Sequence, residues 1–390
     1  MPANKPPFDG EWVKVAEVFN LQIGKTPSRK KMEYWNTGEY DWVSIKDLGP
    51  YGRFVGRTKE TISELGRIES GIKQVPSNTL LMSFKLSLGK TSITTRPIYT
   101  NEAIMAFLDK GTFQFDLGYM WHQFRTKDWA TGTNMAVMGE TLNKKTLGSA
   151  LIRLPDLRTQ RMVASHLDVI QGQLEIAAKK LERLDTLVKS RFVEMFGGSG
   201  WPVATVGSLA TDIRYGTSKK ASDCGQFVYL RMNNMTDGGG LDFGDVKHID
   251  LSGAELEKCQ VVDGDLLFNR TNSREKVGKT AVFHAKEPMV IAGYIIRVRL
   301  GDRIKPDFLA AYMNLPTTKA MLRSIARGAV HQANINSREL SAIEVPVPPI
   351  CLQDSFLSFV AEVDKSRFIV QQKIEKLQML YNSLAQEYFG

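Results

Sequence analysis

LPDLRTQRMVASHLDVIQGQLEIAAKKLERLDTLVKSRFVEMFG, residues 154–197, decides the fold, because a related stretch, VPPICLQDSFLSFVAEVDKSRFIVQQKIEKLQMLYNSLAQEYFG, follows at residues 347–390. The likeness begins earlier, since residues 142–197 align with residues 335–390 without a gap. An ungapped match of this length indicates a tandem repeat. The identical positions include Asn143/Asn336, Leu147/Leu340, Pro155/Pro348, Gln160/Gln353, Lys180/Lys373, Glu182/Glu375, Leu184/Leu377 and the closing Phe-Gly pairs at 196–197 and 389–390.

Each copy has the residue spacing of one long helix. Apolar side chains recur three or four residues apart from Leu167 to Met195 in the first copy and from Val360 to Tyr388 in the second. That alternation is typical of a coiled-coil seam. Prolines precede both stretches, where a missing N–H costs little, and Gly197 ends the first.

We expect the two helices to pair with each other. Each has about 40 residues and would be roughly 60 Å long at about 1.5 Å per residue. An apolar stripe of that length does not stay exposed to water, and the repeat favours an antiparallel coiled coil with a pseudo-twofold axis. Two amphipathic helices docked separately on their own domains are the alternative. Arg191 and Arg367 interrupt the two seams. The residues that we expect at the helix interface are Leu167, Ile170, Leu174, Leu181, Leu184, Val188, Val360, Val363, Ile374, Leu377, Tyr381 and Leu384.

The segments before the helices resemble each other more loosely. Residues 88–91 (LGKT) match residues 277–280 (VGKT), and residues 75–83 parallel residues 261–269. Loop residues differ between the copies, which favours two domains that bind different targets. The expected fold is α+β, with two mixed α/β domains and two long helices in tandem: a first domain at 1–154, a first helix at 155–197, a second domain at 198–345 and a second helix at 346–390.

Composition and charge narrow the class of protein. Hydrophobic residues make up 43% and charged residues 24%, which is ordinary for a globular protein. The net charge of +9 favours a polyanionic partner. There is no run of eighteen apolar residues and no signal-peptide core, so we expect a cytoplasmic protein without a membrane partner. The isolated Cys224, Cys259 and Cys351 predict neither a disulfide framework nor a zinc site.

Catalytic motifs are incomplete or missing in the sequence. The Gly-Lys-Thr triplets at 89–91 and 278–280 end like a phosphate-binding P-loop, which needs a Gly five places before its second Gly. Phe84 and Ser273 occupy those places, so the nucleotide interpretation fails. The five histidines show no metal-ligand or triad spacing. We therefore expect no catalytic residue, metal site or cofactor in this chain.

Two segments carry binding chemistry instead. Residues 24–31 (GKTPSRKK) form a basic loop suited to phosphate contact, with a merely solvated charge run as the alternative. Residues 269–273 (NRTNS) follow an apolar run, and Arg and Asn make paired hydrogen bonds to guanine and adenine. A structural turn capped by Asn272 is the alternative. The candidate DNA contacts are Lys25, Ser28, Arg29, Lys30, Lys31, Lys46, Lys85, Lys90, Tyr215, Lys219, Lys220, Arg231, Asn233, Asn234, Asn269, Arg270, Thr271, Asn272, Ser273, Lys279 and Gln332.

Together these segments resemble a known family. Residues 24–28 with 42–48 are similar to the opening of target-recognition domains in Type I restriction-modification specificity subunits. Residues 264–273 with 277–279 resemble a second variant of the same domain. The prolines and glutamines that precede the two long helices, at 155, 160, 348 and 353, match the family's helical regions, and the likeness spans nearly the whole chain.

The resemblance implies a fold, partners and a division of labour. Each mixed α/β domain would read a half-site of a few base pairs in the major groove of double-stranded DNA. The helix pair would act as a ruler and dock two modification subunits, which would carry S-adenosylmethionine and methylate adenine N6. Restriction subunits would add ATP- and Mg²⁺-dependent translocation and cleavage. The first domain departs from the Asn-Arg-Thr-Asn pattern, because residues 83–87 read SFKLS there.

The sequence therefore favours a non-catalytic specificity subunit that reads a bipartite, asymmetric DNA site with an unread spacer. A self-contained DNA-modifying enzyme with atypical motifs is the alternative from another class. A coiled-coil adaptor whose basic charge is incidental is a third hypothesis.

Overall fold

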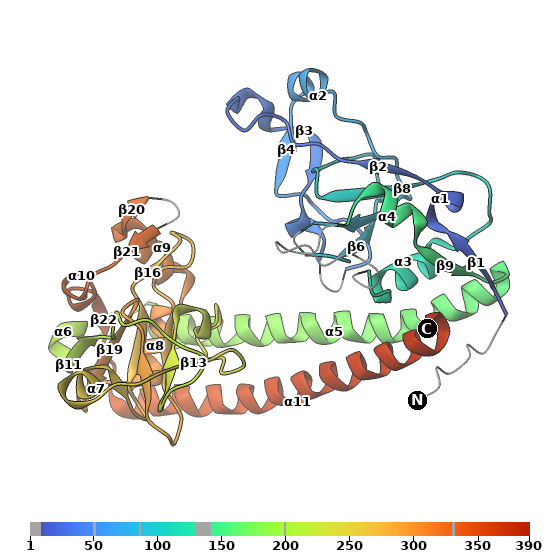
Figure 1. The fold of residues 1–390 in the computed structure, drawn as a ribbon. Helices are drawn as coiled ribbons and strands as arrows, with labels where there is room; N and C mark the ends of the chain where they lie inside the picture. Colours follow the sequence, from blue (N-terminus) through green and yellow to red (C-terminus); the bar gives the residue numbers. More distant parts are fainter. Residues whose placement is uncertain (1–8, 50–51, 86, 130–141, 199, 330–331) are drawn as a thin grey trace. The chain divides into compact units, whose positions relative to one another are not determined.

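The computed structural model describes residues 9–49, 52–85, 87–129, 142–198, 200–329 and 332–390. The chain divides into two compact units, which we call unit 1 (Met1–Lys180 with Val370–Gly390) and unit 2 (Leu181–Ile369). The division cuts both long helices, α5 (Leu157–Phe196) and α11 (Ile350–Phe389), so each unit holds one domain and one half of each helix (Figure 1).

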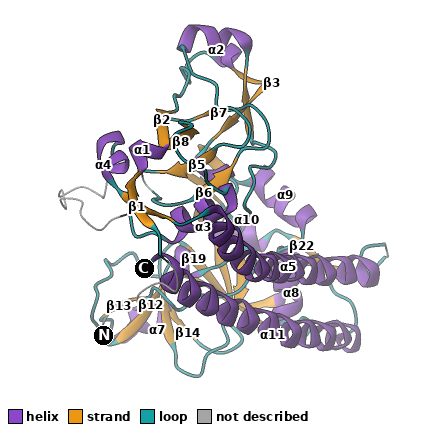
Figure 2. Cartoon of the chain, turned by 90° about the vertical axis from the view of Figure 1, so that its right-hand side faces the viewer, coloured by secondary structure: helices purple, strands orange, loops and turns teal. Residues whose placement is uncertain are grey.

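The domain of unit 1 is built on two sheets. The larger has the strand order β2-β8-β5-β6, all antiparallel, and the smaller has the order β4-β3-β7. A ribbon of β1 and β9 precedes the long helix, and α1 and α4 lie next to it (Figure 2). The bounds are β1 Glu11–Lys14, α1 Val15–Val18, β2 Phe19–Ile23, η1 Met32–Tyr34, β3 Trp35–Val43, η2 Ile45–Asp47, β4 Glu60–Ile62, α2 Glu64–Ser70, β5 Leu80–Ser83, β6 Thr91–Ile93, β7 Tyr99–Thr100, β8 Ile104–Asp109, α3 Leu117–Thr126, α4 Lys144–Ser149 and β9 Leu151–Leu154.

The domain of unit 2 repeats this plan. Its main sheet has the order β11-β19-β15-β17, and a second sheet has the order β13-β12-β18-β14. A ribbon of β10 and β22 again precedes a long helix, and a small sheet, β16-β21-β20, is added. The bounds are β10 Val203–Thr205, α6 Val206–Leu209, β11 Ala210–Tyr215, β12 Phe227–Leu230, η3 Met232–Asn234, β13 Lys247–Ile249, α7 Gly253–Cys259, β14 Gln260–Val261, β15 Leu266–Asn269, β16 Thr271–Asn272, β17 Thr280–Val282, β18 Met289–Ile291, β19 Ile295–Leu300, α8 Pro306–Met313, α9 Pro316–Ile325, β20 Arg327–Ala329, β21 Gln332–Asn334, α10 Ser337–Ser341 and β22 Glu344–Pro346.

Residues at equivalent positions of the two domains have the same structural roles. Asn143 accepts backbone hydrogen bonds at the start of α4, and Asn336 does the same at the start of α10, as N-cap residues do. A Cβ on Gly24 would lie 2.2 Å from the carbonyl oxygen of Thr100, and one on Gly216 would lie 2.1 Å from that of Ile291. Both glycines therefore allow the chain to pass closely over a neighbouring strand. The tandem repeat expected from the sequence is confirmed at this level.

The two long helices run antiparallel in each unit. In unit 1, the Nδ1 atom of His166 lies 2.9 Å from the hydroxyl of Tyr388, and Lys373 donates to Gln173 over 3.0 Å. In unit 2, Arg367 forms an ion pair with Asp185 at 2.6 Å. That pair explains how the seam tolerates Arg367, because the guanidinium meets a carboxylate on the facing helix.

The expected seam residues lie between the helices, as the periodicity predicts. Those that are fully or nearly fully buried are Leu167, Ile170, Leu174, Val363, Ile374 and Tyr381. Those that are half-buried are Leu181, Leu184, Val188, Val360, Leu377 and Leu384. Aromatic rings replace aliphatic packing near the domain of unit 2, where Phe192 meets Phe356 edge to face. The alternative of two separately docked helices is therefore wrong.

A buried glutamine joins each long helix to its own domain. The Gln160 side chain accepts a hydrogen bond from the backbone N–H of Asp116 at 2.7 Å and donates to the carbonyl of Pro155 at 2.8 Å. Gln353 accepts from the backbone N–H of Lys305 at 2.8 Å and donates to the carbonyl of Pro348 at 2.8 Å. Both side chains are fully buried. The same joint thus fixes the first turn of α5 to the start of α3 and the first turn of α11 to the start of α8.

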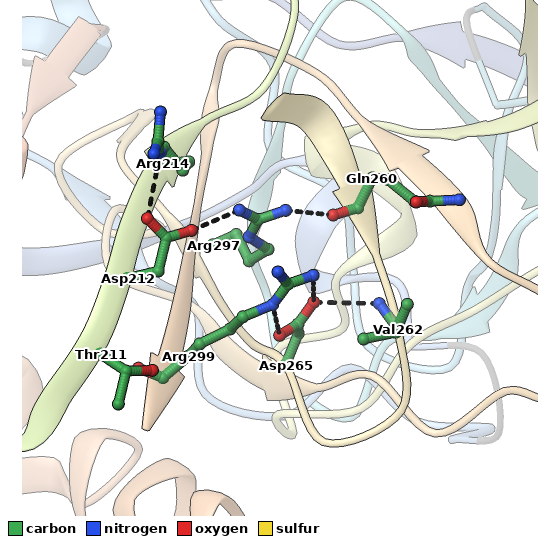
Figure 3. A network of polar contacts seen from close by, with 8 residues as sticks. All are labelled: Thr211, Asp212, Arg214, Gln260, Val262, Asp265, Arg297 and Arg299. Carbon is green, nitrogen blue, oxygen red and sulfur yellow. Dashed lines mark hydrogen bonds and ion pairs between the residues drawn. The ribbon is translucent and has the colours of Figure 1, made fainter. Parts of the chain in front are cut away.

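A charged network links the two sheets of unit 2 (Figure 3). The buried Arg297 of β19 pairs with Asp212 of β11 and donates to the carbonyl of Gln260 in β14. Arg214, which is exposed, donates to the same Asp212 carboxylate at 2.8 Å. The partners outweigh the burial of the carboxyl and hold the pKa of Asp212 below its usual range. Arg297 therefore anchors one sheet to the other from inside the domain.

We expect Gln353→Ala to lower the free energy of unfolding by about 2–4 kcal/mol, because it leaves one N–H and two carbonyl groups near the helix root without partners. Urea unfolding of the full chain measures this. Gln372→Ala is the matched control on the exposed side of the same helix, where a change within about 0.5 kcal/mol is expected. Equal losses in the two variants would contradict the role given to the buried amide.

We expect Arg297→Met to destabilise unit 2 by about 3 kcal/mol, since it removes the buried partner of Asp212. Arg214→Met removes the exposed partner of the same carboxylate, and a loss below about 1 kcal/mol is expected. Thermal unfolding of both variants compares the two arginines directly. Equal losses of stability in Arg214→Met and Arg297→Met would contradict the view that burial makes the Arg297–Asp212 ion pair important.

Candidate nucleic-acid interface

The turn after β15 carries the sharpest candidate, Arg270. Its guanidinium lies 4.8 Å from the ring centroid of Tyr215 and donates to the carbonyl of Gly293 at 3.3 Å. Together with α7, these residues line a cavity of about 390 Å³. The Nε atom of Arg270 has no hydrogen-bond partner among the described residues. The side chain is therefore held in place by a stacking contact and by a hydrogen bond from one end of its guanidinium.

Two neighbours in that turn need a different assignment from the one expected. Asn269 is fully buried, donates to the carbonyls of Thr271 and Tyr294, and accepts from Asn272 at 3.1 Å. Thr271 is also buried, in the β16 pairing with β21. Their burial puts both side chains out of reach of a base edge. The alternative of a structural turn braced by Asn272 fits Asn269 and Thr271, and Arg270 is the residue that the turn presents.

Asn234 requires the same correction. It is buried in η3, where it accepts from the backbone N–H of Arg231 at 2.9 Å and donates to the carbonyls of Asp242 and Asp245. Asn233 beside it is exposed and stays a candidate contact. Sequence alone does not separate these two asparagines, because the distinction depends on a loop that folds back from eight to eleven residues away.

The corresponding turn of unit 1 has different chemistry. Phe84 occupies the place of Arg270, and it is buried. The backbone N–H of Phe84 bonds to the carbonyl of Ala103, just as that of Arg270 bonds to the carbonyl of Tyr294. Lys85 is half-buried, with its ammonium 5.3 Å from the Phe84 ring. The two domains thus use one backbone frame to hold a half-buried arginine in one case and a buried apolar ring in the other.

The basic loop of unit 1 is less cationic than its sequence indicates. Arg29 pairs with Glu60 and stacks 3.6 Å from the Trp35 ring centroid. Lys31 pairs with Glu69 at 2.6 Å, and that hydrogen bond raises the pKa of Lys31. Two of the four cations are therefore neutralised by carboxylates from β4 and α2.

The other expected contacts divide by their exposure and partners. Lys219, Arg231 and Lys279 form ion pairs with Glu255, Asp245 and Asp237 respectively. The remaining exposed candidates without an ion pair among the described residues are Lys25, Ser28, Lys30, Lys46, Lys90, Lys220 and Gln332, and Tyr215, Asn272 and Ser273 are half-buried.

The Gly-Lys-Thr triplets close hairpins. Gly89 and Gly278 have φ angles of +79° and +81°, which favour glycine. Their N–H groups bond to the carbonyls of Ser83 and Asn269 at the ends of β5 and β15. The triplets are structural turns in both domains.

A buried polar cluster in unit 1 was missed by the sequence analysis. His122 of α3 contacts the hydroxyl of Tyr381 at 2.7 Å through Nδ1 and the Asp168 carboxylate at 2.6 Å through Nε2. Arg53 pairs with the same carboxylate. Burial, and then the charges of Arg53 and Arg125, lower the pKa of His122 to about 2, so the ring is neutral. The cluster fixes α3 to both long helices, and its members are too distant in sequence to give a motif.

The repeat also marks one exposed face of each long helix. Ile176, Lys180, Leu187, Ser190 and Glu194 are identical in the second copy, and their spacing places them on one stripe. Every one of them is exposed, as are Ile369, Lys373, Leu380, Ser383 and Glu387. Buried seam positions differ more, for example Val188 against Tyr381. Packing inside the chain does not explain why exposed apolar residues are identical in the two copies of the helix.

The described ranges contain no group of three or more His, Cys, Asp or Glu side chains that could hold a metal ion. Nor do they contain a helix long and apolar enough to cross a membrane.

Comparisons with known proteins agree with the repeated fold. Residues 8–186 match the family described as the Type I restriction modification DNA specificity domain. The MjaIX Type I specificity subunit of Methanocaldococcus jannaschii is 26% identical over 49% of this chain and 45% of its own length. The EcoKI specificity subunit of Escherichia coli is 22% identical over 60% of this chain and 55% of its own length. The chain thus spans about half the length of these curated relatives.

A solved structure extends the likeness in fold to nearly the whole chain. It belongs to work on the complex assembly and conformational transition of the type I R-M system, and it covers 98% of both chains with a TM-score of 0.51 at 16% identity. The chain is therefore similar to Type I restriction-modification DNA specificity subunits, by the family match over residues 8–186 and by its fold along nearly the whole length.

Proposed function

We propose that this chain is the non-catalytic specificity subunit of a Type I restriction-modification complex and that it reads a bipartite, asymmetric DNA site with an unread spacer. One observation carries the proposal: a single domain frame occurs twice, with Arg270 and Phe84 at the same turn. Contacts to base edges specify the DNA sequence, whereas contacts to the phosphates only position the protein. Two readers that share a frame and differ at this turn suit two different half-sites.

Arg270 is the residue that we assign to direct readout in the second domain. A guanidinium fork matches the O6 and N7 acceptors of guanine in the major groove. Stacking on Tyr215 and the bond to Gly293 restrict the side chain before DNA arrives, so less conformational entropy is lost on binding. Tyr215 is itself fixed, since its hydroxyl accepts from the backbone N–H of Ser337 at 2.8 Å.

The exposed stripe of each helix supports docking of partner subunits. Because the stripe repeats in both copies, it suits two copies of the same partner related by the pseudo-twofold. Its basic Lys180 and acidic Glu194 would meet opposite charges on an amphipathic partner helix. We assign the stripe to two modification subunits, which would bind S-adenosylmethionine and methylate adenine N6. Restriction subunits using ATP and Mg²⁺ would join the same complex in the cytoplasm.

Methylome sequencing of a host that carries the chain with its partner subunits tests the function. We expect a bipartite methyladenine motif that depends on this chain. Arg270→Ala should weaken binding by about 1–3 kcal/mol and relax one position of one half-site. Arg270→Lys keeps the charge without the fork and should relax the same position. A motif unaffected by either variant would overturn the assignment of Arg270, and the absence of any bipartite motif would overturn the function.

We expect Ile176→Glu with Leu380→Glu, both in unit 1, to reduce the bound modification subunits from two to one. Ile369→Glu with Leu187→Glu in unit 2 should do the same, and the four changes together should abolish docking. Burying these introduced carboxylates against an apolar partner surface is costly. Native mass spectrometry of the purified complex counts the subunits. Ile68→Glu, at an exposed apolar residue of α2, is the control and should keep two.

A further inference from the structure

A cluster of cations in unit 2 lacks matching negative charge. Lys276 and Lys279 lie in the hairpin that joins β15 to β17, and Lys319 and Arg323 lie on α9. Asp237 pairs with Lys279 at 2.6 Å and also attracts Lys276 and Lys319. Glu275 is the carboxylate of the hairpin itself, and it is exposed. This contrasts with the basic loop of unit 1, where Arg29 and Lys31 each have a carboxylate of their own.

Two of the ammonium groups are fixed around the hairpin turn. Lys319 donates to the carbonyl of Gly278 at 2.5 Å, and Lys279 donates to the carbonyl of Met235 at 3.0 Å. Gly278 is the turn glycine immediately before Lys279, so the Lys319 ammonium is held next to the residue that carries the second lysine. The Lys279 side chain is only 12% exposed. These lysines are held by the fold and are not freely solvated.

The surroundings of Lys319 disfavour its positive charge. Burial, together with repulsion from Lys279, Arg323 and Lys189, lowers the pKa of Lys319 to about 8, while Asp237 opposes them. A site with crowded cations and a partly buried lysine gains most from a bound anion, which relieves the repulsion. The cations come from two elements, the hairpin and α9, and a compact, strongly charged anion such as a phosphate group suits several ammonium and guanidinium groups at once.

We propose that Lys276, Lys279, Lys319 and Arg323 form a phosphate-binding site that holds the DNA backbone against the second domain. The inference rests on the proposed function, since it names the surface that receives the DNA strand. It also gives a role to Lys279, whose Gly-Lys-Thr motif is a turn and not a nucleotide-binding loop. Phosphate contacts fix register and orientation, and base contacts such as that of Arg270 then read sequence.

The salt dependence of DNA binding by the assembled complex tests the site. Each lost phosphate contact lowers the slope of log K against log salt by about 1. We expect Lys276→Gln with Arg323→Gln to lower it by about 2 on a duplex carrying the complex's own site. Lys286→Gln with Arg303→Gln removes the same charge from other exposed positions of unit 2 and should leave the slope unchanged. An unchanged slope in the first pair, or equal losses in both, overturns the proposal.

A pH series supplies a second readout. Bound phosphate favours the protonated form of Lys319, so its pKa rises above about 8 in the complex. Wild-type affinity should be constant below pH 8 and should fall as the pH rises through 8. In Lys319→Met that fall should disappear, whereas Arg270→Ala should retain it. A fall that persists in Lys319→Met counts against the site.

Binding of sodium triphosphate distinguishes a site for the DNA backbone from a site for a free phosphate compound. The DNA assignment would be overturned if the wild type bound triphosphate, the variant Lys276→Gln with Arg323→Gln lost that binding, and the same variant kept the wild-type salt slope for DNA. Failure of the proposed function has a different signature, because the wild-type complex would then bind no duplex with sequence preference. Specific wild-type binding with no effect of the variants overturns only the inference.

Discussion

The buried glutamine at the root of each long helix is the constraint on which the rest of the structure depends. A glutamine side chain both accepts and donates hydrogen bonds, so Gln160 satisfies a backbone N–H of its domain and the carbonyl of Pro155, just before its own helix. Gln353 repeats the arrangement. Because neither amide is exposed, losing it would leave several backbone groups unpaired at once. Helix and domain are therefore fixed to each other before any seam contact is counted.

Next to this shared hydrogen-bonded joint, the two units use different side chains to pack the domain against the long helices. In unit 2, Phe192, Phe308 and Phe356 pack edge to face or tilted, and the contact relies on buried apolar area. In unit 1, His122 and Tyr381 form a polar contact whose hydrogen bonds must all be made at once. The aromatic contact of unit 2 tolerates small shifts of its side chains, whereas the hydrogen-bonded contact of unit 1 requires one geometry. The repeat thus preserves the frame while each domain has its own means of attachment.

Much of the fold follows from the sequence, because it depends on local periodicity. The three-four spacing from Leu167 and from Val360 predicts the helices and their seam, and both are present. The site is harder to predict, because it depends on which side chains the loops cover. Asn269 and Asn272 look alike in the sequence, yet one is buried and the other half-exposed. No local pattern reports that Glu60 will neutralise Arg29 from 31 residues away.

The distribution of ion pairs matters more for DNA binding than the net charge does. A cation that already has a carboxylate partner must break that contact, or bring the carboxylate toward the phosphate, and its net gain is small. The basic loop of unit 1 is in that position, since Glu60 and Glu69 are built into the domain beside it. The cation cluster of unit 2 differs, because Asp237 pairs with Lys279 but also attracts Lys276 and Lys319, and repulsion among the cations still lowers the pKa of Lys319. The most conspicuous basic run in the sequence is therefore a weaker candidate for phosphate binding than a cluster assembled from residues more than forty positions apart.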